Sequence, residues 1–238
     1  HEFINGEKRW CIWLADADPS AFRNLREIKK RIEAVQAFRK NSKKLATVKL
    51  ADSPYLFAEI RQPKNDFVLI PCHSSENRHF VPMAFFDKKH IVSNSCACLP
   101  TANLYHFGVL QSTMHMAWTR QICGRIKGDY RYSNNIVYNN FAWPEKPTDK
   151  QKQAIETAAQ GVLDARAKFP GSSLADLYDP LTMPPVLLKA HQTLDRAVDV
   201  AYGKTNFKTE AERVAFLFEL YQKYTSLFPP ETPKRRGK

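Results

Sequence analysis

Between Arg120 and Trp143, basic and amide side chains alternate with aromatic ones, and the segment holds one acidic residue. The residues in it that could do chemistry are Arg120, Arg125, Lys127, Asp129, Tyr130, Arg131, Tyr132, Asn134, Asn135, Tyr138, Asn139, Asn140 and Phe141. Arginine and lysine bind phosphates and donate to O6 and N7 of guanine, asparagine binds adenine, and aspartate accepts from N4 of cytosine. The segment therefore predicts contact with nucleic acid.

Lys127 and Asp129 are separated by Gly128 alone. In an extended stretch, residues two apart point to the same side of the chain. Lys127 could then donate to a guanine while Asp129 accepts from the opposing cytosine. A surface ion pair in a strand or turn is the simpler interpretation of so short a motif.

The net charge agrees with a polyanionic partner. The 238 residues carry a formal charge of +12, and most of this excess lies before residue 150. No apolar run approaches the roughly 20 residues needed to cross a bilayer, so we expect nucleic acid and no membrane. On charge alone, the candidates for phosphate contacts are Arg78, Arg120, Arg125, Lys43 and Lys44.

Catalytic and metal-binding patterns are not visible in the sequence. It has no G-x-G-x-x-G motif after a strand, no P-loop, no G-x-S-x-G motif and no H-E-x-x-H motif. We therefore expect no catalytic residue, cofactor site or metal site, and this chain alone is not expected to be an enzyme. The five scattered cysteines contain no C-x-x-C pair and predict reduced thiols in a cytoplasmic protein.

Two kinds of periodicity divide the chain near Pro147. Before it, apolar runs predict strands at 10–14, 55–60, 67–71, 80–86, 91–92 and 96–99, and helical spacing predicts helices at 20–38 and 104–122. Phe107, Leu110, Met114 and Trp118 form the apolar stripe of the second helix. Such a stripe is typical of core packing.

After Pro147 the pattern is helical only. Thr148-x-x-Gln151 predicts a capped helix through about Lys168, Pro185 suits the first turn of a second, and Thr209-x-x-Glu212 opens a third. His191 falls beside an apolar face and is interpreted as an interior histidine. The expected fold is α+β, with a mixed strand and helix domain at 1–147 and a helical bundle at 148–238. We expect the bundle to end in a disordered basic tail from Pro229 to Lys238.

Several motifs together resemble the target-recognition region of MmeI-type DNA methyltransferases. They are Met114–Trp118, Gly124-Arg125, Tyr130–Ser133 and Val137–Pro144, with further matches at Phe3–Gly6, Trp13-Leu14 and Ser74–Glu76. Leu174–Pro180 and the stretch to Ala201–Gly203 resemble the C-terminal helical region of the family. The likeness covers nearly the whole chain. Phe141-Ala142-Trp143-Pro144 departs from the Phe-Pro-Trp-Pro form of the family, which should alter local stiffness only.

The resemblance implies a class I, S-adenosylmethionine-dependent adenine-N6 methyltransferase of a type II restriction–modification system. Its cofactor-binding and catalytic motifs lie upstream of this region, and a nuclease domain can lie further upstream. The chain, which begins at His1, would be the double-stranded DNA recognition module of this longer protein. Residues 1–45 would then form a junction to the methyltransferase domain, which is the expected partner within the same polypeptide.

The resemblance also suggests which residues read DNA. Lys127 and Asp129 match two reading positions, in a form associated with G·C, and Arg131 matches a further one. Cys72, Asn94 and Ser95 lie near the other variable reading positions of the family. Ser74 and Ser75 join the basic residues as candidates for contacts with the DNA backbone.

Two other functions fit the composition. One is a stand-alone nucleic-acid adaptor, such as an RNA-binding one, in which Tyr130, Tyr132, Tyr138 and Phe141 stack on unpaired bases. The other is a structural scaffold whose basic charge serves protein partners. Competition between duplex DNA and single-stranded RNA separates the first from a DNA reader, and weak salt dependence of DNA binding would indicate the second.

Overall fold

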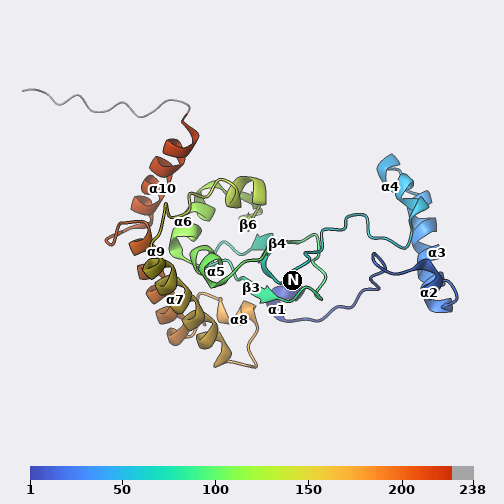
Figure 1. Cartoon of the computed structure of the whole chain (residues 1–238), viewed down its shortest axis with the longest axis horizontal. Coiled ribbons are helices and arrows are strands. Elements are labelled where there is room, and N and C mark those ends of the chain that lie inside the picture. Colours follow the sequence, from blue (N-terminus) through green and yellow to red (C-terminus); the bar gives the residue numbers. More distant parts are fainter. Residues whose placement is uncertain (227–238) are drawn as a thin grey trace, which may run out of the picture. The chain divides into compact units, whose positions relative to one another are not determined.

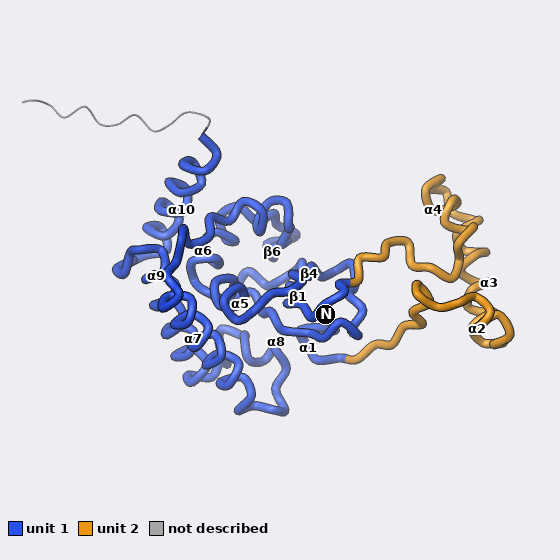
Figure 2. The backbone as a smooth tube through the Cα atoms, viewed as in Figure 1, with its two compact units in different colours: residues 1–7, 63–238 blue, residues 8–62 orange. Residues whose placement is uncertain are grey.

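The computed structural model describes residues 1–226, so the predicted tail Pro229–Lys238 lies outside the described residues. Two compact units make up the described chain, one formed by residues 1–7 and 63–226 and the other by residues 8–62 (Figure 2). The larger unit contains both the predicted recognition strands and the C-terminal helices. The domain boundary near residue 147 stays a prediction.

The strands of the larger unit form two small antiparallel sheets (Figure 1). The first has the order β3-β1-β4, with β1 at Phe67–Pro71, β3 at Ala84–Phe86 and β4 at Cys96–Pro100. The second has the order β2-β6-β5, with β2 at His73–Ser74, β5 at Gly124–Ile126 and β6 at Asp129–Arg131. Because Cys72 alone separates β1 from β2, the chain passes directly from one sheet into the other.

The predicted strands at 67–71 and 96–99 are confirmed, and the strand at 80–86 is reduced to Ala84–Phe86. The strands expected at 10–14, 55–60 and 91–92 are wrong. Residues 8–62, all of which the structure describes, contain no strand that could pair with either of the first two runs. An apolar run without a neighbouring strand has no ladder of hydrogen bonds to join, and Trp10 is in fact exposed.

Helices form most of the remaining regular structure in the larger unit. They are α1 (Glu2–Asn5), α5 (Leu104–Leu110), α6 (Thr113–Ile122), the π-helix η2 (Asn134–Tyr138), α7 (Asp149–Ala167), α8 (Leu174–Leu177), α9 (Pro185–Ala201) and α10 (Glu210–Thr225). A strand and helix region followed by a helical C-terminal region is the α+β fold that the sequence predicts. This prediction is confirmed.

The helix expected over 104–122 is two helices, α5 and α6. The Ser112 side chain accepts a hydrogen bond from the backbone N–H of His115 and so caps a new helix after Gln111. All four residues of the predicted stripe, from Phe107 to Trp118, are nevertheless buried. The apolar spacing was therefore a correct guide to the core, and the cap decided where the helix breaks.

One hydrophobic core joins the strand and helix region of the larger unit to its C-terminal helices. Helices α7 and α9 pack along each other, and α5 packs on α7 (Figure 1). The approach is closest at Gly108, where a Cβ atom would lie 2.7 Å from Cγ2 of Ile155. A glycine is needed at this position because any side chain would push α5 away from α7.

The predicted helix starts after Pro147 are confirmed. Thr148 and Gln151 form a reciprocal capping box at α7, Pro185 is the first residue of α9, and the Thr209 side chain accepts from the backbone N–H of Glu212 at α10. His191 is buried as expected. Its ring stacks on Phe80, with 3.9 Å between ring centroids.

Asp195 on α9 holds the first residue of α6, because its Oδ1 atom accepts from the backbone N–H of Thr113 at 2.7 Å. Burial raises the pKa of this carboxyl to about 6, although the hydrogen bonds from Thr113 and the charge of Arg213 lower it. A carboxyl whose pKa is higher in the folded state than in the unfolded state stabilises the fold while it is protonated. This stability is present below about pH 4 and is lost as the pH rises through 6.

Asp195→Asn keeps an oxygen acceptor for Thr113 but does not titrate. We expect the free energy of unfolding of the variant, relative to that of the wild type, to rise by about 1–2 kcal/mol between pH 4 and pH 7. Urea unfolding at several pH values measures this difference. Asp164→Asn, at an exposed position of α7, is the control. A difference that stays flat with pH would contradict the prediction.

The smaller unit, residues 8–62, consists of α2 (Pro19–Phe22), α3 (Arg26–Lys40), α4 (Leu45–Lys49) and the 3₁₀ helix η1 (Leu50–Asp52). The single helix expected over 20–38 is thus two helices, separated at residues 23–25. Arg39 donates to the carbonyl oxygens of Leu50, Ser53 and Leu56. The buried apolar side chains of this smaller unit are Leu14, Phe22 and Ala51, and none of them lies on α3.

Candidate nucleic-acid interface

Strands β5 and β6 form a hairpin whose two-residue turn is Lys127-Gly128. Both turn residues have a positive φ, 53° at Lys127 and 102° at Gly128, as a type I′ turn requires. A left-handed conformation costs a residue with a side chain about 1–2 kcal/mol. Lysine is a less common residue at this position than Asn or Gly.

The extended geometry expected for Lys127 and Asp129 is wrong, because Lys127 lies in the turn and Asp129 begins β6. Along β6 the side chains alternate, so Tyr130 is buried while Asp129 and Arg131 are exposed on the opposite face. Lys127 is also exposed. Within residues 1–226, neither the Lys127 ammonium nor the Arg131 guanidinium makes a hydrogen bond or an ion pair. Both donors are therefore available to a ligand.

The other predicted base-reading residues lie beside this hairpin. The backbone N–H of Cys72 donates to the carbonyl of Ser95 at 3.0 Å, and the carbonyl of Cys72 accepts from Tyr132 at 2.8 Å. His73, the next residue, pairs with Arg131 across β2 and β6. The fold thus brings together positions 72, 95 and 131, which lie far apart in the sequence, and Asn94 is exposed next to Ser95.

Cys72 is half-buried, and this burial raises the pKa of its thiol, although the nearby Arg131 charge opposes the shift. The thiol is therefore neutral near pH 7 and offers a weak S–H donor. Asn94 and Ser95 supply amide and hydroxyl groups. Together with the β5–β6 hairpin, these residues form an edge that offers thiol, amide, hydroxyl, ammonium, carboxylate and guanidinium groups.

Ser74 and Ser75 differ in what they can contact. Ser74 pairs with Tyr130 and shares its inward face, and the Ser74 hydroxyl is buried without a hydrogen-bond partner among residues 1–226. This burial does not favour a contact of the Ser74 side chain with DNA, and that contact stays a prediction. Ser75 is half-buried at the start of the loop between β2 and β3, where its hydroxyl accepts from the N–H of Asn77 at 3.3 Å. Contact of Ser75 with DNA stays a prediction.

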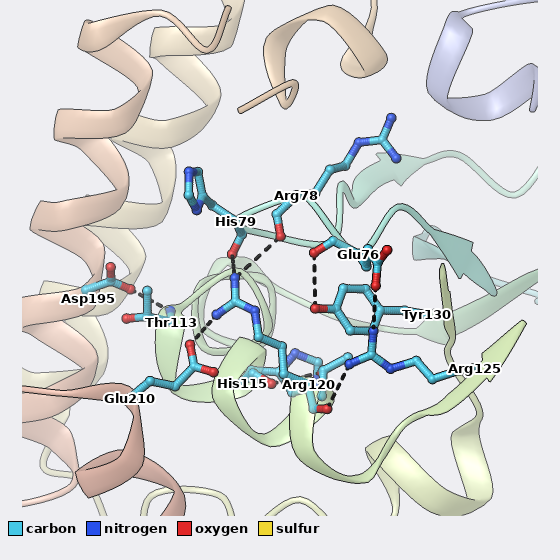
Figure 3. A network of polar contacts seen from close by, with 11 residues as sticks. Glu76, Arg78, His79, Thr113, His115, Arg120, Arg125, Tyr130, Asp195 and Glu210 are labelled. Carbon is cyan, nitrogen blue, oxygen red and sulfur yellow. Dashed lines mark hydrogen bonds and ion pairs between the residues drawn. The ribbon is translucent and has the colours of Figure 1, made fainter. Parts of the chain in front are cut away.

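Two of the predicted phosphate contacts have other roles in this fold. Arg120 pairs with Glu210 and donates to the carbonyl oxygens of Arg78 and His79 (Figure 3). Arg125 lies 4.1 Å from the ring centroid of Tyr130 and donates to the carbonyl oxygens of Gly128 and Arg120. Sequence charge suggested both as phosphate ligands, but each guanidinium already donates to backbone carbonyl oxygens, and that of Arg120 also pairs with a carboxylate. Contact of Arg120 and Arg125 with phosphate stays a prediction.

Arg78 remains a candidate. In Figure 3 its guanidinium points away from the Arg120 network, and only its backbone carbonyl takes part. Burial lowers the pKa of Arg78, while the charges of Asp179 and Asp129 oppose the shift. Its Nε atom is buried without a hydrogen-bond partner among residues 1–226. Lys43 and Lys44 are exposed in the smaller unit, and their contact with phosphate stays a prediction.

Three of the four aromatic residues that could have stacked on unpaired bases are buried. Tyr130 and Tyr132 are each 3% exposed, and Phe141 is 5% exposed. His115 packs on the rings of Tyr132 and Phe141. Stacking on unpaired bases needs open ring faces, which these three residues lack. Tyr138 is half-buried, and stacking by this residue stays a prediction.

Sequence reasoning missed two residues of this edge. His73 is exposed opposite Arg131, and Glu76 lies against the hairpin turn, where its Oε1 would be 2.9 Å from a Cβ atom on Gly128. Gly128 was a signal for a turn, because glycine adopts a positive φ without strain. No local pattern indicated that the loop after β2 lies beside that turn.

Family models match nearly the whole chain. The model described as "MmeI, target recognition domain" matches residues 1–145, and the model described as "MmeI, C-terminal domain" matches residues 147–228. This chain belongs to the MmeI family.

Two relatives show the extent of this MmeI-type region. DNA methyltransferase A of Bacillus subtilis (strain 168) is 39% identical over 224 residues, which are 94% of this chain and 25% of that protein. The structure of the type IIL restriction–modification enzyme MmeI in complex with DNA superimposes with a TM-score of 0.92 at 50% identity, over 95% of this chain and 30% of that chain. The chain thus spans between a quarter and a third of the length of these relatives.

Methyltransferases of this kind generally use S-adenosylmethionine, and the residues of this MmeI-family chain do not fit it. Both sheets are antiparallel and three-stranded, so residues 1–226 lack the crevice at the carboxyl ends of parallel strands where nucleotide-like cofactors bind. Among the same residues, no three His, Cys, Asp or Glu side chains are placed to hold a metal ion. No helix in the described part of the chain is both long and apolar enough to span a membrane.

Proposed function

We propose that this chain is the sequence-specific, double-stranded DNA recognition module of an S-adenosylmethionine-dependent adenine-N6 methyltransferase in a restriction–modification system. The observation that carries the proposal is the gathering of polar side chains at one edge, where the Lys127 and Arg131 donors are exposed and make no hydrogen bond or ion pair among residues 1–226. Loops that are far apart in the sequence meet there, around Cys72, Ser95 and Arg131. Such loops on a rigid support suit the reading of base edges in a duplex groove.

In this proposal Lys127, Asp129 and Arg131 read bases from the β5–β6 hairpin. Cys72, Asn94 and Ser95 read bases beside it. Ser75 and Arg78 contact the DNA backbone from the loop after β2, and Lys43 and Lys44 do so from the smaller unit. Backbone contacts set the register of the protein on DNA, and base contacts supply the specificity.

The chemical step belongs to another part of the longer protein. That part would bind S-adenosylmethionine and take the target adenine out of the duplex before methyl transfer. The smaller unit supports a partner within the same polypeptide. Trp10 is 90% exposed, and Phe38 and Leu45 are also largely exposed, so this unit leaves much apolar surface for another domain to cover. We propose that the methyltransferase domain covers it.

Salt dependence tests the DNA-binding part of the proposal. Because each neutralised phosphate releases counterions, we expect affinity for duplex DNA to fall on the order of 100-fold between 50 and 200 mM salt if about four phosphates are contacted. Fluorescence anisotropy with a labelled duplex measures this slope. Single-stranded RNA of equal length is the competitor. Stronger competition by RNA, or a flat salt dependence, would overturn the proposal in favour of an adaptor or a scaffold.

A further inference from the structure

The loop of residues 75–83 connects β2 to β3 and is held through its backbone. Five of its carbonyl oxygens accept hydrogen bonds from side chains elsewhere in the unit. The Tyr130 hydroxyl donates to the carbonyl of Glu76 (3.2 Å), and the Arg120 guanidinium donates to the carbonyls of Arg78 (3.4 Å) and His79 (3.3 Å). The Gln111 amide donates to the carbonyl of Val81 (2.5 Å), and the Arg166 guanidinium donates to that of Met83 (2.7 Å). Side chains from β6, α6, α7 and the residue after α5 therefore set the path of a loop that belongs to neither sheet.

Arg120 connects this loop to the C-terminal helices. Figure 3 shows its guanidinium between the carboxylate of Glu210 and the carbonyl oxygens of Arg78 and His79. The planar fork of arginine presents donors in fixed directions, so one guanidinium can bind both groups at once. The Glu210 carboxylate orients the Arg120 guanidinium, and the guanidinium binds the backbone of residues 78 and 79.

Helix α10, which carries Glu210, is held in place by contacts with α9 and α6. Arg213 forms two hydrogen bonds with the carboxylate of Asp199 on α9, at 2.6 and 2.9 Å. The rings of Phe218 and Tyr221 pack against Trp118 of α6, with 5.3 and 5.7 Å between ring centroids. These contacts fix the start of α10 relative to α6, which carries Arg120.

The loop in turn contacts the hairpin. The backbone N–H of Glu76 donates to Oδ1 of Asp129 at 3.3 Å, and the Glu76 carboxylate lies 3.8 Å from the guanidinium of Arg125. A shift of residues 75–79 would therefore change the orientation of the Asp129 carboxylate and the position of Arg78.

We propose that Glu210 is a positioning residue for DNA recognition, acting through Arg120 on residues 75–79 and on Asp129. This inference rests on the proposed function and adds to it a specific task for the C-terminal helices. Glu210 touches no base-reading residue, and its negative charge by itself would repel DNA. Its effect on binding must therefore come through the loop.

The test compares Glu210→Gln with Glu212→Gln. Both changes remove one negative charge from the first turn of α10, but Glu212 contacts the backbone N–H of Lys208 instead of Arg120. We expect amide hydrogen exchange at residues 76–78 to become several-fold faster in Glu210→Gln alone. We also expect duplex affinity to fall about 3- to 5-fold, whereas loss of a repelling charge would strengthen binding. Unchanged exchange together with equal or tighter binding would overturn the inference.

Arg120→Lys separates positioning from phosphate contact. Lysine keeps the positive charge but lacks the fork, so positioning predicts the same loss as in Glu210→Gln, while a phosphate contact would largely survive. Near wild-type affinity and exchange in Arg120→Lys would count against positioning. The exchange measurement uses the chain without DNA, so it tests the link from Glu210 to residues 76–78 independently of DNA binding. Failure of the wild-type chain to bind duplex DNA would instead refute the proposed function.

Discussion

Replacing Lys127→Glu and Asp129→Arg together in the full-length protein is expected to change the base pair preferred at one position of the methylated site. The double change exchanges the donor and the acceptor at the tip of the β5–β6 hairpin. A side chain that donated to a guanine would then accept from a cytosine, and its neighbour would do the reverse. One well-placed contact discriminates between bases by about 1–3 kcal/mol, so the preference should change by roughly 10- to 100-fold.

Mapping of methylated adenines by sequencing measures this change. Reversal of another exposed pair, Lys223→Glu with Glu145→Lys, is the matched control, because these residues form a 2.8 Å ion pair that is not part of the hairpin. The control should leave the methylated sequence unaltered. An unchanged recognition sequence in the hairpin variant, with methylation still active, would refute base reading by Lys127 and Asp129.

Arg166→Met is expected to lower the free energy of unfolding by about 3–4 kcal/mol. Arg166 of α7 donates to the carbonyl of Met83 at 2.7 Å, to Oε1 of Gln111 at 2.6 Å and to the hydroxyl of Tyr178 at 2.9 Å. Hydrogen bonds to a charged group contribute about 1.5–3 kcal/mol each, and buried acceptors left without a donor add to the loss. Methionine fills a similar volume but replaces none of these donors.

The same network includes His191, whose Nε2 atom lies 2.8 Å from the hydroxyl of Tyr178. Burial, with the Arg166 charge, lowers the pKa of His191 to about 3, so the ring is neutral at pH 7. Urea unfolding at pH 7 measures the effect of Arg166→Met. Arg196→Met, at an exposed position of α9, should change stability by less than about 0.5 kcal/mol. A loss below 1 kcal/mol for Arg166→Met would show that the network does not stabilise the unit.

Local patterns in the sequence were sufficient for several features. The reciprocal cap of Thr148 and Gln151 and the buried stripe from Phe107 to Trp118 depend on residues within a few positions of one another. Helix caps and apolar periodicity act through the same short-range geometry wherever the segment lies. The family resemblance was confirmed because its motifs are distributed along nearly the whole chain.

Contacts between distant segments decided the rest. The run Trp10–Leu14 has the composition of a strand but no neighbouring strand to pair with, and the donors of Arg120 are occupied by carbonyl oxygens about 40 residues away and by a carboxylate 90 residues away. The sequence alone determined the residue types available for DNA reading and the caps that begin the C-terminal helices. The tertiary structure decided which of those residues face outward and which hold the fold, because hydrogen bonds and burial are satisfied between segments that no local pattern connects.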